Sequence, residues 1–204
     1  MSGRGFSVPP GRAGRLWLDR RLTVARRAAD LLDRKLRLLQ ADLARREEAA
    51  ALAAAEWERD RLDAERWLLR ASLLGGQRAI RLGNDGQYAD IEVRYAITMG
   101  VRHPDSASCV VPQAAGWDGP ALAAARRAHQ AALAAAVRHA AAAEALTLIR
   151  AEALATRHRL HALKDRWIPG LEQAMAEVTL AIEEQELADA ARLRLAAPVR
   201  EAGQ

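Results

Sequence analysis

Apolar residues recur along the first third of the chain with the spacing of a heptad repeat. Counting alternately four and three residues from Leu18 meets an apolar side chain at nearly every step as far as Leu74, and only Arg46 and Asp60 interrupt the series. A repeat of about 3.5 residues keeps one stripe facing a partner helix over many turns, so the pattern predicts a coiled-coil helix. At about 1.5 Å per residue this helix would be roughly 85 Å long.

The pattern changes between residues 75 and 119. Gly75-Gly76 indicates the end of the first helix, and alternating apolar and polar residues over 89–97 predict a half-buried strand. Residues 83–86 are typical of a tight turn before that strand, and residues 109–111 of a second short strand. We therefore expect a small hairpin cap, which is too short for a dinucleotide-binding domain.

Helical spacing returns at Pro120 and lasts to about Leu195. After Trp167 the seam residues follow one another at successive intervals of four residues, whereas a heptad repeat alternates three and four. This stutter coincides with Pro169-Gly170, so a kink or straightened segment is expected there. The Ala-rich seam of residues 121–143 allows close approach of the helices with little apolar area to hold them.

Together these patterns predict a mainly α protein, a long antiparallel two-helix coiled coil with a β-hairpin in its middle segment. The expected segments are an irregular start (1–14), a first helix (15–74), a middle cap (75–119), a second helix (120–196) and a tail (197–204). The residues expected to pair the two helices are Leu32, Leu36, Leu39, Leu43, Leu160, Leu163, Trp167 and Leu171.

Charge is distributed unevenly along the chain. Residues 1–46 carry twelve Lys or Arg against four Asp, whereas residues 172–191 carry six carboxylates and no basic residue. These ends attract each other if they lie side by side, which favours an antiparallel fold-back over a parallel self-dimer. A basic face is also typical of nucleic-acid binding, but the acidic segment supplies a partner within the chain, so no nucleic acid is expected.

Membrane and export signals are not evident in the sequence. Arg126, Arg127, Arg138 and Glu144 interrupt the Ala-rich stretch, which predicts no direct membrane insertion. Residues 1–10 lack the apolar core of a secretory signal, and the single cysteine, Cys109, suits a reducing compartment. We expect a cytoplasmic protein, peripheral on a membrane complex.

No constellation of residues predicts catalysis. The chain has no Gly-rich phosphate loop followed by Lys and Ser or Thr, so it is expected to be non-catalytic and to need no cofactor. His158, His161 and Asp165 share a helix face but lie among arginines that repel a cation, so no metal site is expected. His103 is interpreted as a loop residue.

Three stretches in order along the chain carry a family resemblance. They are Pro10-Gly11-Arg12 followed by Leu31-Leu32-Asp33-Arg34-Lys35-Leu36, then Ile97-Thr98-Met99-Gly100-Val101, and finally Ile168-Pro169-Gly170-Leu171-Glu172. They resemble corresponding stretches of the D subunits of the V/A-type rotary ATPases. Asp33 stands where that family usually has Lys, Lys164 where it has Glu, and His161 where it commonly has Asn.

The resemblance implies a central stalk, or rotor shaft, that couples ATP hydrolysis or synthesis in a catalytic hexamer to rotation of a membrane ion-translocating ring. Its implied partners are the catalytic and non-catalytic nucleotide-binding subunits of the hexamer, a small companion subunit and a membrane-rotor adaptor. The implied contact residues are Arg12, Arg15, Arg192 and Arg194 at the hexamer, and Tyr95, Met99, Gly100 and Val101 toward the membrane side.

Two alternatives remain open from the sequence. A prefoldin-like chaperone also joins two helices through β-hairpins, although an Arg-rich helix tip does not suit it. An Arg-rich coiled coil that binds nucleic acid would show affinity falling steeply with salt.

Overall fold

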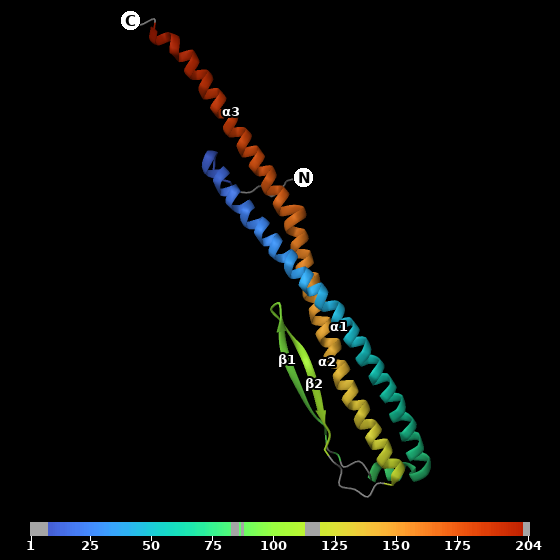
Figure 1. Cartoon of the computed structure of the whole chain (residues 1–204). Coiled ribbons are helices and arrows are strands. Elements are labelled where there is room, and N and C mark those ends of the chain that lie inside the picture. The colour runs from blue at the N-terminus through green and yellow to red at the C-terminus, as the bar shows by residue number, and fades with distance from the viewer. Residues whose placement is uncertain (1–7, 83–85, 87, 113–118, 202–204) are drawn as a thin grey trace. The chain divides into compact units, whose positions relative to one another are not determined.

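The computed structural model describes residues 8–82, 86, 88–112 and 119–201, which are mostly helical (Figure 1). The elements in order are α1 (Gly11–Leu82), β1 (Asp90–Thr98), β2 (Val101–Val110), α2 (Pro120–Ala162), a π-helical turn η1 (Leu163–Trp167) and α3 (Ile168–Glu201). The expected mainly α class, with long helices before and after an antiparallel hairpin, is confirmed. The chain packs as two units: residues 1–36 with 155–204 form unit 1, and residues 37–154 form unit 2.

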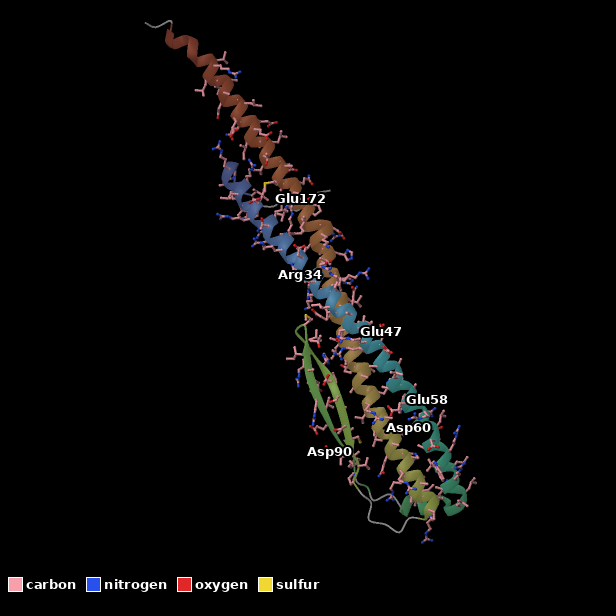
Figure 2. The ribbon with its side chains drawn as sticks, viewed as in Figure 1. Arg34, Glu47, Glu58, Asp60, Asp90 and Glu172 are labelled. Carbon is pink, nitrogen blue, oxygen red and sulfur yellow. The ribbon has the colours of Figure 1, made fainter. Side chains whose placement is uncertain are left out.

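Unit 1 pairs the start of α1 with α3 in antiparallel order. Arg12 contacts Glu186, whereas Arg26, further along α1, contacts Glu172, which precedes Glu186 on α3. Figure 2 labels Glu172 on this helix. Between the helices lies a buried cluster that other apolar side chains cover. The cluster consists of Leu18, Leu22, Ala25 and Leu171, with Trp17, Ile168, Met175 and Val178 packed against it. The heptad stripe therefore forms the core of this unit.

The helical stretch α2–η1–α3 changes geometry where the stutter was expected. Residues Leu163–Trp167 form a π-helical turn, and the backbone N–H of Ile168 bonds to the carbonyl of Leu163. Pro169 follows at once, and a proline in a regular helix clashes with the carbonyl four residues before it. A wider turn moves that carbonyl away, so a π-helical turn accommodates Pro169 within a helix that continues on both sides.

Unit 2 pairs the later part of α1 with α2, again in antiparallel order. Glu47 contacts Arg150 and Glu56 contacts Arg138, each at 2.8 Å. Apart from Leu39 and Ile149, the buried apolar positions of this pairing are alanines. They are Ala50, Ala64, Ala71, Ala125, Ala135, Ala145 and Ala153. Small side chains let two helices approach closely but bury little apolar area.

The helices run further than the sequence indicated. Gly76 has a non-helical φ of 68°, yet helical backbone resumes after it and lasts to Leu82. The seam ends earlier than α1 does, since Leu74 is 78% exposed. At the other end of the chain α3 passes through Pro198 to Glu201, where a tail was expected. The start of α1 at Gly11 likewise shortens the expected irregular segment.

Strands β1 and β2 pair in an antiparallel hairpin with a register shift between Arg94 and Tyr95. The expected turn at residues 83–86 lies largely outside the described residues. The second strand is longer than the expected 109–111, and the expectation that the first strand is half-buried is wrong. Its apolar residues are exposed: Ile91 by 51%, Val93 by 37%, Tyr95 by 54% and Ile97 by 73%. The alternation is present, but no layer covers the apolar face among the residues described.

One helical stretch, Pro120–Leu195, is long and apolar enough to cross a membrane by length and composition, with a mean hydropathy of 1.4 in its apolar window. Charged residues still interrupt this stretch, since every window of 18 residues within it contains at least one. Alanine raises hydropathy in soluble helices too, so these two criteria do not separate a membrane span from a helix in water.

Candidate subunit-contact surfaces

An apolar groove of about 650 Å³ lies beside the first turns of α1 in unit 1. Trp17 and Val24 of α1 line it together with Leu163 and Trp167 of η1. Val24 is 65% exposed, and Trp167, which was expected in the helix-pairing seam, is 41% exposed. The guanidinium of Arg21 lies 4.6 Å from the centroid of the Trp17 ring, so the groove has a basic rim. Such a surface suits a partner with apolar and acidic side chains.

A smaller hollow of about 490 Å³ holds two of the residues implicated by the family resemblance. Arg12 and Arg15 line it, together with Leu22 of α1 and Met175 of α3. The side chain of Arg12 is 85% exposed, although its guanidinium lies 2.7 Å from a carboxylate oxygen of Glu186. An ion pair this exposed is weak, so Arg12 remains available to a partner.

Arg192 and Arg194 lie on the part of α3 that continues past the start of α1, since Arg12 is already opposite Glu186 (Figure 1). Arg192 contacts Asp189 at 3.2 Å, and both arginines are exposed. Exposed leucines accompany them: Leu187, Leu193 and Leu195 are 72%, 73% and 76% exposed. Within residues 8–201, this stretch of α3 therefore presents both apolar and basic side chains.

The hairpin places Met99, Gly100 and Val101 at its tip, and Tyr95 opposite Pro104, three residue pairs from the turn. Met99 and Gly100 form the turn, and both have positive φ, 50° and 85°, the conformation of a two-residue hairpin turn. Tyr95 and Met99 are 54% and 46% exposed, while Val101 is half-buried. The guanidinium of Arg102 lies 4.2 Å from the centroid of the Tyr95 ring and orients it.

Arg46, the first interruption of the seam, connects the hairpin to α1. Its Nε donates to Asp42 at 2.6 Å, and one of its terminal nitrogens lies 3.1 Å from Nε2 of His103. His103 is fully buried, and its ring also contacts Thr98 Oγ1 at 2.9 Å and the carbonyl of Pro104 at 2.8 Å. No local pattern indicated that His103 was more than a loop residue, so sequence reasoning missed it.

Asp60, the second interruption, makes no comparable connection to any of the residues that the structure describes. Its carboxylate accepts a hydrogen bond from the neighbouring Arg59 at 2.9 Å, and this bond raises the pKa of that guanidinium. One residue further, the hydrogen bond from Arg61 lowers the pKa of Glu58. Glu58 and Asp60 both lie on α1 (Figure 2). These contacts are local, between residues that are one or three positions apart on α1.

The residues expected to pair the helices differ in burial. Leu39 and Leu171 are fully buried and Leu160 is 7% exposed, whereas Leu32, Leu36, Leu43 and Leu163 are half-buried. Of the histidines considered as metal ligands, His161 contacts Asp165 at 3.1 Å. Across residues 8–82, 86, 88–112 and 119–201, no three His, Cys, Asp or Glu side chains gather to hold a metal ion.

The comparison with known protein families decides among the alternatives. A family described as the D subunit of ATP synthase matches residues 16–197, which is most of the chain. The chain belongs to this ATP synthase family. No curated protein matches the chain significantly. As a member of the D-subunit family it is a stalk subunit of a rotary ATPase, and it associates with other subunits of a membrane-associated complex.

Proposed function

We propose that the chain is the central rotor shaft of a V/A-type ATPase or ATP synthase. It couples ATP hydrolysis or synthesis in a hexamer of nucleotide-binding subunits to rotation of a membrane ion-translocating ring, and it is itself non-catalytic. The observation that carries the proposal is the antiparallel pairing of basic α1 with acidic α3 in unit 1, within a chain of the D-subunit family.

Two unlike helices inside a ring of repeated subunits present a different surface to each subunit. Arg12 and Arg15 lie on α1, while the leucines and arginines past Glu186 lie on α3 alone. Each surface stabilises one conformation of the ring subunit that faces it. The two surfaces therefore stabilise different conformations in different subunits of the ring. Turning the shaft changes which subunit is favoured, and coupling follows from that difference in contact free energy.

The hairpin is proposed to make the contacts on the membrane side. Met99, Gly100 and Val101 lie at its tip and Tyr95 lies near it, and we propose that they face the membrane-side partners, a small companion subunit and an adaptor of the membrane rotor. An exposed methionine and tyrosine suit such contacts, because they offer apolar area on adaptable or amphipathic side chains.

Coupling is tested in the assembled complex in membrane vesicles. Combined replacement Arg12→Ala, Arg15→Ala, Arg192→Ala and Arg194→Ala is expected to lower ATP-driven ion transport per ATP hydrolysed, because the contacts that distinguish ring conformations are weakened. The matched control is Arg66→Ala with Arg70→Ala, which removes exposed arginines of α1 in unit 2. Transport and hydrolysis that stay in their original ratio in the fourfold variant would contradict the assigned contact surface.

Co-purification tests the identity of the partners. The tagged chain is expected to bring down nucleotide-binding subunits, and recovery of a hexameric chaperone or of nucleic acid in their place would refute the proposal. Replacing Tyr95 and Met99 by Ser is expected to lose the companion and adaptor subunits while the hexamer is retained.

A further inference from the structure

The contact between Arg46 and His103 joins residues 57 positions apart in sequence, one on α1 and one on β2. Both belong to unit 2. Arg46 is held from the other side by Asp42, which is only 8% exposed and also accepts a hydrogen bond from Arg45 at 3.0 Å. The contact with Asp42 therefore holds the guanidinium of Arg46 in the position from which it contacts the imidazole of His103.

The partners of His103 determine its protonation state in this arrangement. An arginine only donates hydrogen bonds, so Nε2 must accept from Arg46 and carries no proton. The carbonyl of Pro104 only accepts, so Nδ1 carries the proton and donates to it. The ring is thus neutral, and the hydroxyl of Thr98 shares Nε2 as a second donor.

The rest of the hairpin is loosely covered. Along β1, all residues from Asp90 to Tyr95 are exposed, and burial is concentrated at His103 and Pro104 near the tip. The polar contacts of His103 described above come from α1 and from the hairpin itself. The His103 imidazole therefore attaches the most buried part of the hairpin to α1 through a polar contact.

We propose that His103 is a positioning residue that latches the hairpin tip onto α1 only while its imidazole is neutral. A proton on Nε2 turns the acceptor into a donor and places a positive ring 3.1 Å from the guanidinium of Arg46. The contacts of His103 within the hairpin survive this change, because Nε2–H then donates to Thr98 and Nδ1–H still donates to Pro104. Acid thus releases the hairpin from the helix without unfolding it.

The neighbouring charges oppose this release only in part. Asp42 is the carboxylate that holds Arg46, and its oxygens are engaged by Arg45 and Arg46. The hydrogen bond between Arg46 and His103 involves a charged group, and such bonds are among the stronger ones in proteins. Losing it lets the hairpin tip open locally, and local opening of this kind determines how mobile a segment is. The latch is a property of this chain and needs no other subunit, so it stands apart from the proposed function.

The full chain offers a direct test, because Cys109 on β2 is its only cysteine. A second label is introduced by Glu48→Cys, an exposed position on α1, and the distance between the two spin labels is measured between about pH 8 and about pH 5, where histidines change charge. The wild-type distribution is expected to be narrow at the upper pH and broad at the lower, with the released fraction rising roughly tenfold or more.

Variants separate the latch from general loosening. His103→Gln offers a neutral acceptor for Arg46 and is expected to keep a narrow distribution at both pH values, whereas Arg46→Ala is expected to be broad at both. Arg45→Ala is the matched control, since Arg45 also contacts Asp42 but is 77% exposed and does not touch His103; it is expected to follow the wild type. A wild-type distribution independent of pH, or acid release that persists in His103→Gln, would overturn the proposal. Far-ultraviolet circular dichroism verifies that each variant keeps its helices.

Discussion

In unit 1 the buried stripe of α1 contains Leu18 and Leu22, and α3 opposes it with Leu171. In unit 2 the same stripe, continued along the same helix, contains Ala50, Ala64 and Ala71, opposed mainly by alanines of α2. Both units have antiparallel helices with ion pairs between them. They differ in how much apolar area lies between the helices.

This difference separates two ways of holding a helix pair. Burying a leucine contributes about 1.5–3 kcal/mol, whereas an alanine offers little area and stabilises mainly by allowing close backbone approach. Unit 2 also buries polar side chains, Asp42 and His103, and uses them to attach its hairpin. The leucine-rich pair depends on area, and the alanine-rich pair depends on fit and on specific polar contacts.

The largest effect is expected from reducing that contrast, by removing a buried leucine of unit 1. Leu171→Ala removes a fully buried side chain and should lower the free energy of unfolding by about 2–5 kcal/mol, as cavities in packed cores do. Urea denaturation followed by circular dichroism measures it. Leu187→Ala, at an exposed leucine of the same helix, is the control and should change little; equal losses would show that burial in unit 1 does not carry its stability.

An intermediate effect is expected from adding apolar area at a buried alanine of unit 2. Ala135→Leu adds a large side chain at a position only 1% exposed, and overpacking of this kind costs about 1–3 kcal/mol. The same denaturation experiment measures it, with Leu133→Ala, at a neighbouring position that is 39% exposed, for comparison. If Ala135→Leu stabilised the protein, the helices of unit 2 would not be as closely packed as the structure has them.

The smallest effect concerns a single ion pair in unit 1. Lys164 Nζ lies 3.5 Å from Asp33 Oδ1, and both residues depart from the usual family pattern, which the resemblance gives as Glu at position 164 and Lys at position 33. We therefore expect the two departures to compensate each other by exchanging charge. Asp33→Lys or Lys164→Glu alone should cost up to about 1 kcal/mol because like charges meet, and the double variant should recover most of it. Additive losses in the double-mutant cycle would contradict the exchange.

How far the sequence leads depends on whether a feature is local. The heptad stripe located the core of unit 1, and the stutter before Pro169 located the irregular segment, since both are spacings along one helix. The form of that irregularity, a π-helical turn, could not be predicted because kinks and wide turns share one pattern. Alternation likewise identified β1 but not its exposure, because period-two spacing places side chains on two faces and does not say what covers either face.

By itself, the sequence determined the long helices, the hairpin between them, the attraction between a basic beginning and an acidic end, and membership of a family of rotary ATPase stalk subunits. Only the tertiary structure decided that Arg46 meets His103, and that Trp167 leaves the seam to line a groove. The physical reason is range. Periodicity and charge act between neighbours on one element, whereas a contact between residues 57 positions apart exists only after the chain has folded back on itself.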